Sequence, residues 1–177
     1  MLTADLTRRE FSSRLASLFA FASVPHLRST AISLSSPNEV SHAAEAIHQE
    51  ITINATARRV YAALTDAKQF SALMAFSSVP KAPPAQISRE VGGTFSVFGG
   101  HILGRHLELV PSQRIVQAWR VVDWEPGIYS IARFRLKDQG TKTTIVFDHT
   151  GFPKGLGEHL AAGWHQNYWE PLRKYLE

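Results

Sequence analysis

The most constraining feature of the sequence is a series of short segments after Pro84 in which apolar and polar residues alternate. Successive side chains of a strand point to opposite faces of a sheet, so each such segment predicts a strand with one buried face. Short connections between strands are typical of antiparallel neighbours. Turn residues separate these segments at Gly92-Gly93, Gly99-Gly100, Pro111-Ser112, Pro126-Gly127 and Gln139-Gly140. The pattern therefore predicts an antiparallel sheet of six or seven strands.

The two faces of this sheet follow from the parity of the residues. One face is strongly apolar and collects Phe95, Val97, Leu107, Leu109, Ile115, Trp119, Val121, Ala132, Phe134, Leu136, Ile145 and Phe147. The other face reads as a solvated surface, on which Asp148 is placed to pair with an arginine, and it carries Arg120, Arg133, Arg135, Thr144 and Asp148. A patch for an acidic partner is the alternative interpretation of these arginines. The apolar face of such a sheet must be buried against another element of the fold.

Two short helices and a further strand are expected before the sheet segments. Residues 47–53 alternate and predict a strand. Apolar residues at helical spacing follow Thr56, which can cap a helix over residues 56–66. A second helix is expected from Ala67 to Met74, with Asp66 as its cap.

The final segment, from Gly155 to Tyr175, is the element large enough to cover the sheet. Leu160, Trp164, Tyr168 and Leu172 follow one another at four-residue steps and form one apolar stripe. Pro171 is expected to kink or end this helix. The two histidines of the segment, at positions 159 and 165, are six residues apart, so one helix cannot aim both at one metal ion.

Bulk composition limits the class of protein. A chain of 177 residues suits one core-bearing domain, and the hydrophobic fraction of 44% is ordinary for a globular protein. The net charge of +4 is thinly spread, which argues against nucleic acid as a partner. The absence of cysteine excludes disulfides and cysteine-ligated metals. No apolar run reaches the roughly 20 residues of a membrane span.

The first 45 residues read as a targeting segment and linker, and residues 46–177 as the folded domain. The motif Thr7-Arg8-Arg9-Glu10-Phe11 resembles a twin-arginine export signal, and the stretch from Leu15 to Val24 supplies its short apolar core. We therefore expect Arg8, Arg9 and Phe11 to engage the twin-arginine export machinery and the protein to be periplasmic or exported. A cytoplasmic protein with an N-terminal extension is the alternative. Cleavage sites are available at residues 20–22 and 44–46.

Five ordered blocks in the folded part resemble one superfamily. They are ITINATARRVYAALTD from Ile51, REVGGTFSVFG from Arg89, LELVPSQRIVQAW from Leu107, TTIVFDHTGFP from Thr143 and GWHQNYWEPL from Gly163. Together they resemble the SRPBCC, or START-like, superfamily, in the AHSA-type branch named for activators of the ninety-kilodalton heat-shock chaperone ATPase. The resemblance implies an α+β helix-grip fold, in which a curved antiparallel β-sheet wraps around a long C-terminal α-helix and leaves an internal cavity.

On function, the resemblance leaves three alternatives, because members of this superfamily differ in activity on one scaffold. The first is binding of a small apolar or aromatic molecule, as a carrier or sensor. The second is a cyclase or hydrolase that uses the same cavity. The third is a module that activates a chaperone ATPase, which requires a cytosolic partner.

The candidate ligand contacts are aromatic residues together with two polar residues on the apolar face. A few polar groups in an apolar cavity are typical of a small-molecule site. Gln117 and His149 are these polar groups, although His149 can instead bond a backbone carbonyl and Gln117 can bridge to a neighbour. The ligand-binding set is Phe95, Gln117, Trp119, Phe134, Phe147, His149, Trp164 and Tyr168. We identify no catalytic constellation, no metal ligands and no cofactor site in the sequence.

His101 and His106 are less favoured as ligand contacts. They lie five residues apart, so a regular strand sends them to opposite faces. Trp124 falls in a loop where the mouth of a cavity is expected, and its alternative role is packing on the edge of the sheet.

Overall fold

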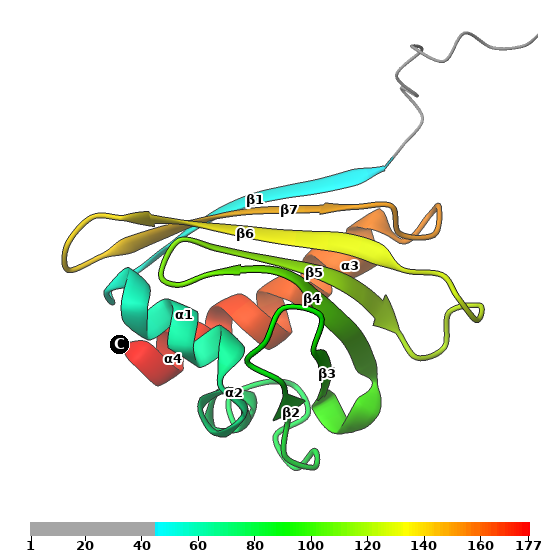
Figure 1. The fold of residues 1–177 in the computed structure, drawn as a ribbon, viewed down its shortest axis with the longest axis horizontal. Helices are drawn as coiled ribbons and strands as arrows, with labels where there is room; N and C mark the ends of the chain where they lie inside the picture. Colours follow the sequence, from blue (N-terminus) through cyan, green and yellow to red (C-terminus); the bar gives the residue numbers. More distant parts are fainter. Residues whose placement is uncertain (1–44) are drawn as a thin grey trace, which may run out of the picture. The chain divides into compact units, whose positions relative to one another are not determined.

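A computed structural model describes residues 45–177, all within one compact unit, Val40–Glu177. The export motif with Arg8, Arg9 and Phe11 lies outside the described residues. Figure 1 shows the elements, which in chain order are β1 (Ala46–Ile53), α1 (Ala57–Thr65), α2 (Ala67–Met74), β2 (Gln86–Ile87), β3 (Thr94–Val97), η1 (Phe98–Gly100), β4 (Ile102–Val110), β5 (Arg114–Val121), β6 (Ser130–Asp138), β7 (Thr143–Thr150), α3 (Gly157–Trp164), η2 (His165–Trp169) and α4 (Glu170–Leu176).

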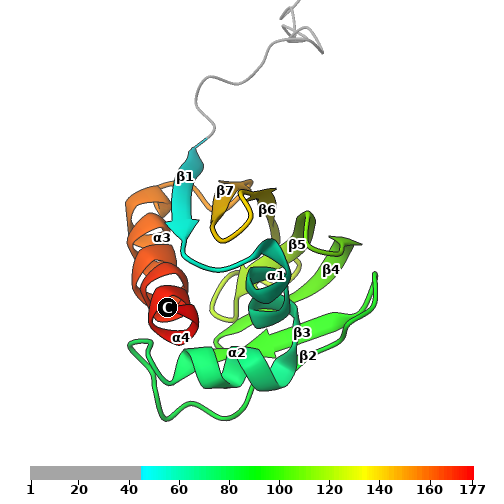
Figure 2. The same cartoon turned by 90° about the vertical axis from the view of Figure 1, so that its left-hand side faces the viewer.

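The described strands form one seven-stranded sheet in the order β1-β7-β6-β5-β4-β3-β2. All neighbouring strands run antiparallel, as predicted. The end-on view in Figure 2 shows the sheet curving from β1 round to β3, with the C-terminal helical segment and α1 on its concave side. This α+β arrangement is the predicted helix-grip fold.

Both short helices begin where their caps were expected. The hydroxyl of Thr56 accepts a hydrogen bond from the backbone N–H of Arg59, and the carboxylate of Asp66 accepts one from the N–H of Gln69. Each cap satisfies one of the N–H groups that a helix start leaves without a partner. α2 spans Ala67–Met74, as predicted.

The C-terminal helix continues past Pro171, so the alternative that this proline ends the helix is wrong, and the alternative that it kinks the helix stays a prediction. The segment runs from α3 through η2, which is a π-helix, into α4. Pro171 occupies the first turn of α4, where a missing N–H is tolerated. A π-helical turn lies directly before α4.

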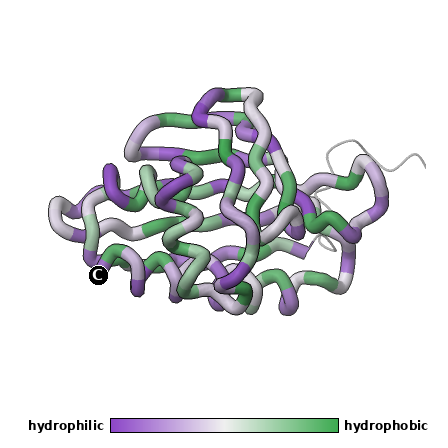
Figure 3. Tube along the Cα trace, turned by 90° about the horizontal axis from the view of Figure 1, so that it is seen from below, coloured by the Kyte–Doolittle hydropathy of each residue, from purple (hydrophilic) through white to green (hydrophobic). Residues whose placement is uncertain are grey.

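The apolar face is the core of the domain, with one correction. Along the strands, hydrophobic and hydrophilic residues alternate, as Figure 3 shows by colour. Of the twelve residues assigned to this face, Leu107 is wrong: its side chain is 45% exposed. The pairing of β4 with β5 shifts register between His106 and Glu108. This irregularity changes which side chains point inward, so His106 is fully buried and Leu107 faces out.

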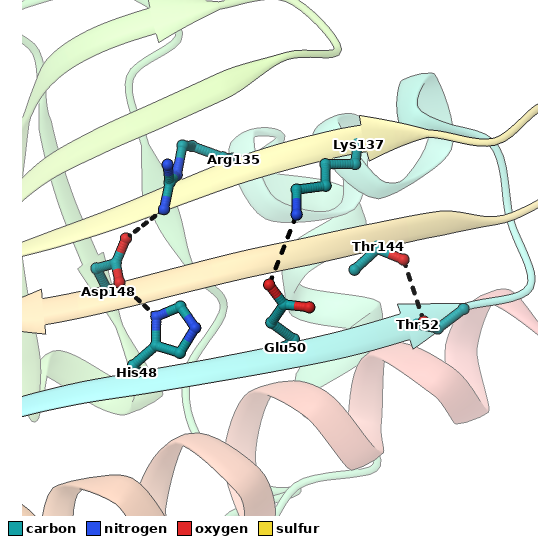
Figure 4. A network of polar contacts seen from close by, with 7 residues as sticks. All are labelled: His48, Glu50, Thr52, Arg135, Lys137, Thr144 and Asp148. Atoms are coloured by element: carbon teal, nitrogen blue, oxygen red, sulfur yellow. Dashed lines mark hydrogen bonds and ion pairs between the residues drawn. The ribbon is translucent and has the colours of Figure 1, made fainter.

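The outer face carries the polar network expected for a solvated surface (Figure 4). Asp148 accepts a hydrogen bond from Arg135 at 2.9 Å, and its other oxygen lies 2.7 Å from Nδ1 of His48. The His48 ring and the Arg135 guanidinium hold the pKa of Asp148 below its usual value. Lys137 and Glu50 form a further ion pair at 3.6 Å. The predicted pairing of Asp148 with an arginine is confirmed.

Glu45, the residue before β1, forms hydrogen bonds with the start of α3. Its carboxylate accepts hydrogen bonds from the backbone N–H groups of Gly155 at 2.6 Å and Gly157 at 3.1 Å. α3 has no side-chain cap of its own at Leu156, so Glu45 performs this role from a distant part of the sequence. Within residues 45–177, no helix is long and apolar enough to cross a membrane.

Candidate functional site

The main cavity lies between the C-terminal helix and the ends of β4 and β5. Its volume is about 230 Å³. Elements far apart in the sequence line it: the loop after α2, the 3-10 turn η1, two strands, α3 and the π-helix. The lining residues are Ser78, Val79, Phe98, His101, Ile102, Trp119, Val121, His159, Leu160, Gly163, Trp164, Asn167 and Tyr168.

Buried aromatic rings form the inner wall. Trp119 lies on β5, while Trp164 and Tyr168 lie one helical turn apart on the facing helix. The ring centroids of Trp119 and Trp164 are 5.4 Å apart, and those of Trp164 and Tyr168 are 4.2 Å apart. The ring of Phe98 meets Tyr168 edge-on at 5.4 Å. The inner wall therefore offers flat, polarisable surfaces from three sides.

The mouth of the cavity is more polar than its interior. Four lining residues are exposed: Ser78, Val79, His101 and His159. The side-chain oxygen of Asn167 accepts hydrogen bonds from both the hydroxyl of Ser78, at 2.6 Å, and its backbone N–H, at 3.2 Å. These two bonds fasten the loop after α2 to the helix at the rim of the cavity.

His149 is fully buried behind the aromatic wall, and both of its ring nitrogens have protein partners. The hydroxyl of Ser130 donates to the carbonyl of Trp119 at 2.9 Å, so it accepts from Nε2 of His149 at 2.7 Å. Nδ1 of His149 then accepts from the indole N–H of Trp164 at 3.0 Å. This arrangement requires a neutral ring with its proton on Nε2. Burial lowers the pKa of His149 to about 4, which agrees with that state.

One polar atom of the cavity wall has no partner. The indole N–H of Trp119 faces the hydroxyl of Tyr168, but the two groups do not meet hydrogen-bond geometry, and Nε1 has no other partner among residues 45–177. Trp119 is only 3% exposed. Burial raises the pKa of Tyr168, so its hydroxyl stays protonated, and its oxygen is the polar atom nearest to this N–H that can act as an acceptor.

A second, much smaller cavity of about 10 Å³ lies on the far side of Tyr168. It has room for about one water molecule. Its lining residues are Leu64, Phe70, Ile87, Phe95, Val97, Ile115, Gln117, Phe134 and Tyr168. The side chain of Gln117 is the polar group that can face such a water.

The structure distributes the predicted ligand contacts over three places. Trp119, Trp164 and Tyr168 line the main cavity. Phe95, Gln117 and Phe134 line the small cavity, which Tyr168 also borders. Phe147 and His149 line neither; Phe147 packs against the ring of Trp164 at 4.4 Å. Contact of any of these residues with a ligand stays a prediction.

Sequence reasoning missed the ring of Phe98 on the inner wall and most of the residues at the mouth. Phe98 adopts a positive φ of 51° beside Gly99 and Gly100, a conformation that periodicity does not reveal. The double glycine marks a turn but not the direction in which the neighbouring ring points. His159 was considered only as a metal ligand, whereas here it borders the cavity. Within the described part of the chain, no group of three or more potential ligand side chains is arranged to hold a metal ion.

The sequence profile of the family described as "Activator of Hsp90 ATPase homolog 1-like protein" matches residues 54–177. The chain belongs to this family. A mouse relative, "Activator of 90 kDa heat shock protein ATPase homolog 2", is 29% identical over 94 residues, which cover 53% of this chain and 28% of that protein.

Other similar proteins carry related names. The human "Activator of 90 kDa heat shock protein ATPase homolog 1" is 28% identical over 91 residues, covering 51% of this chain and 27% of that protein. The chain therefore spans only about a quarter of these two relatives. The crystal structure of an HSP90 activator from Plasmodium falciparum has a TM-score of 0.67 at 25% identity, covering 74% of this chain and 95% of that one.

The fold also occurs in more distant solved structures. The solution structure of the Aha1 dimer from Colwellia psychrerythraea superposes with a TM-score of 0.61 at 19% identity, covering 75% of this chain and 96% of that one. At this identity the likeness concerns the fold alone. It supports the helix-grip architecture predicted from the sequence blocks.

Proposed function

We propose that this domain binds a small hydrophobic molecule in the cavity between the sheet and the C-terminal helix, as a carrier or sensor. The observation that carries the proposal is the cavity of about 230 Å³ with a buried aromatic interior and an exposed polar mouth. Concave sites with apolar walls and a few polar groups are the usual form of small-molecule sites.

The size of the cavity limits the size of the ligand. An apolar cavity of about 150 Å³ holds benzene, and sites for drug-sized molecules begin at about 300 Å³. A volume of about 230 Å³ lies between these limits. It fits a molecule of about two fused rings.

The lining favours binding over catalysis. Among the described residues that line the cavity there is no carboxylate. His149, the histidine first considered for acid–base work, has both nitrogens occupied by Ser130 and Trp164. The histidines that do border the cavity, His101 and His159, are exposed at its mouth. An enzyme of the cyclase or hydrolase type remains the alternative use of the same cavity.

Gly163 provides a sharp test. It lines the cavity, and a Cβ placed on it would meet nothing within 4 Å. Gly163→Leu fills this space and also replaces a glycine in α3 by a better helix former. The matched control is Ala162→Leu, which adds the same side chain at the exposed neighbouring position.

The measurement is titration of the wild-type chain and both variants with 2-naphthol, a fluorescent probe of two fused rings. Wild type and Ala162→Leu are expected to bind the probe saturably, with Gly163→Leu losing at least tenfold in affinity while staying folded. Equal affinity in all three proteins, or no saturable binding by the wild type, contradicts the proposal.

Activation of a ninety-kilodalton heat-shock chaperone is the second candidate, and family membership supports it. The matched region, residues 54–177, covers nearly the whole described domain, and similar proteins are named as activators of that ATPase. The test adds the purified chain to such a chaperone from the same host. Faster ATP hydrolysis by the chaperone supports this candidate. An unchanged hydrolysis rate, with no complex formed between the two proteins, removes it.

We also propose export through the twin-arginine route, which would place the protein in the periplasm. The paired arginines Arg8 and Arg9, the following Phe11 and the short apolar core support this proposal. Export would argue against the chaperone candidate, because a periplasmic protein does not meet a cytosolic chaperone. A protein that stays in the cytoplasm would instead favour the chaperone candidate.

A further inference from the structure

One irregularity in β4 places two neighbouring side chains on the sides of the sheet that suit them least. At the register shift between His106 and Glu108, the ring of His106 points into the core and is fully buried, while Leu107 points outward and is 45% exposed. Burial favours the apolar residue of such a pair, and water favours the polar one. The bulge therefore holds both residues on the side of the sheet that opposes their chemistry.

The buried ring of His106 has little to bind. Neither of its nitrogens has a hydrogen-bond partner among residues 45–177. The backbone of Ser88 favours the protonated ring, but it does not meet hydrogen-bond geometry with either nitrogen. On β3, the ring of Phe95 packs against His106 with 5.4 Å between centroids, and on β5 the residue opposite is Gln117. Both neighbouring strands therefore present uncharged side chains to this ring.

A positive charge on His106 would have no counter-ion in its present place. Burial lowers the pKa of His106, and within the part of the chain that the structure describes no charged side chain raises it. The charged residues nearest in the sequence are at least partly exposed to solvent: Arg89, Glu90, Arg105 and Glu108. Protonation without movement would thus bury an unpaired charge, which is costly.

We propose that acid moves this bulge toward the start of β4, so that His106 turns out to solvent and Leu107 turns into the core. Side chains alternate along a strand, so a bulge placed just before position 107 instead of just after it reverses these two residues and leaves the rest of β4 on its present faces. Solvent then receives the charged ring, and the core receives the apolar side chain.

The strand beside the bulge is suited to this movement. The backbone N–H of His106 donates to the carbonyl of Gly93 at 2.9 Å, and its carbonyl accepts from the N–H of Gly92 at 2.7 Å. The exchange passes these two bonds to Leu107. Glycine restricts the backbone least, so this pair of glycines can follow the change. The inference does not depend on the proposed ligand-binding function.

The solvent exposure of the Leu107 methyl groups measures the exchange directly. Methyl NMR signals of the full ¹³C-labelled chain are recorded at pH 7 and pH 5, with and without a soluble, uncharged gadolinium chelate that broadens the signals of exposed groups. Val122 is the matched control, because it is 44% exposed and lies outside β4. A His106→Leu variant removes the titrating ring and keeps an apolar side chain in the core.

In the wild type, the broadening of the Leu107 signals should fall by about threefold or more from pH 7 to pH 5, because the chelate cannot enter a close-packed interior. The Val122 signals should stay equally broadened. In His106→Leu, Leu107 should remain exposed at both pH values. Unchanged exposure of Leu107 in the wild type would overturn the inference. An equal fall in His106→Leu would also overturn it, because the movement would then not come from His106.

Discussion

Acid is expected to destabilise this domain through His149, and a single substitution should remove the effect. His149 is fully buried, and it is held neutral because Nδ1 accepts a hydrogen bond from Trp164 and Nε2 donates one to Ser130. Protonation of Nδ1 would place a second N–H opposite the indole N–H of Trp164, so that two donors would face each other. Replacing His149 by Gln keeps a donor and an acceptor but removes the titrating group.

The magnitude follows from the pKa values of the folded and unfolded states. The pKa of His149 is about 4 in the folded chain and about 6.5 when unfolded. The unfolded state therefore binds more protons between these values, and stability falls as the pH is lowered through this window. The full loss is about 3 kcal/mol, of which about 1.2 kcal/mol falls between pH 6 and pH 5.

Urea unfolding followed by tryptophan fluorescence at pH 6 and pH 5 measures this difference. The wild type should lose about 1.2 kcal/mol more than His149→Gln over that step. Burial also lowers the pKa of His106, but His106 is present in both proteins, so its contribution cancels. The carboxyl pKa values of Glu108 and Asp148 are held low, so their effects fall at more acidic pH. Equal losses in both proteins would refute the buried neutral network.

Three further predictions concern the core and the N-terminal segment. Gly104→Ala should destabilise the domain by about 3 kcal/mol in the same unfolding assay, because a Cβ would lie 2.2 Å from an aromatic ring and 2.3 Å from a backbone carbonyl; an unchanged midpoint would contradict this packing. Trp164→Ala should cost less than the roughly 3 to 5 kcal/mol of a fully packed core truncation, because part of the ring borders the cavity; a domain that unfolds on this change, with no binding of an apolar probe by the wild type, would mean that the helix only packs. Replacing Arg8 and Arg9 together by lysine should shift the protein from the periplasmic to the cytoplasmic fraction, and an unchanged distribution would show that the motif has no export role.

Local sequence patterns predicted the helices, the strands and their buried faces, whereas the helix-grip arrangement was implied by the resemblance to the superfamily. Thr56 and Asp66 were identified as caps because a side-chain oxygen three residues before a free N–H can reach it in any protein. The inner faces of the strands followed from alternation, which the pleat imposes on every regular strand. These rules need no knowledge of which strands become neighbours.

The failures arose where a residue depends on distant partners. The irregularity between His106 and Glu108 belongs to the pairing of β4 with β5, and no single strand encodes it. Pro171 was read as a helix breaker because periodicity does not reveal the π turns that precede it. Both errors arise from departures from ideal geometry within otherwise correctly predicted elements.

The candidate site was predicted only in part for a related reason. Trp119 was found because parity places it on the apolar face of the sheet, and Trp164 and Tyr168 were found because their four-residue spacing places them on one face of the helix. His149 was also placed on the inner face, but parity cannot tell a side chain that faces a cavity from one that is bonded behind its wall. That difference depends on the directions of the side chains around it.

Native mass spectrometry of the protein purified from its own host tests whether the cavity holds a ligand. The wild type is expected to retain a small apolar molecule, which appears as added mass and is released by mild denaturation. Ala162→Leu should retain the same molecule, and Gly163→Leu, with its cavity filled, should show only the mass of the chain. The bare mass of the chain in all three proteins, or the same added mass in all three, would contradict the account.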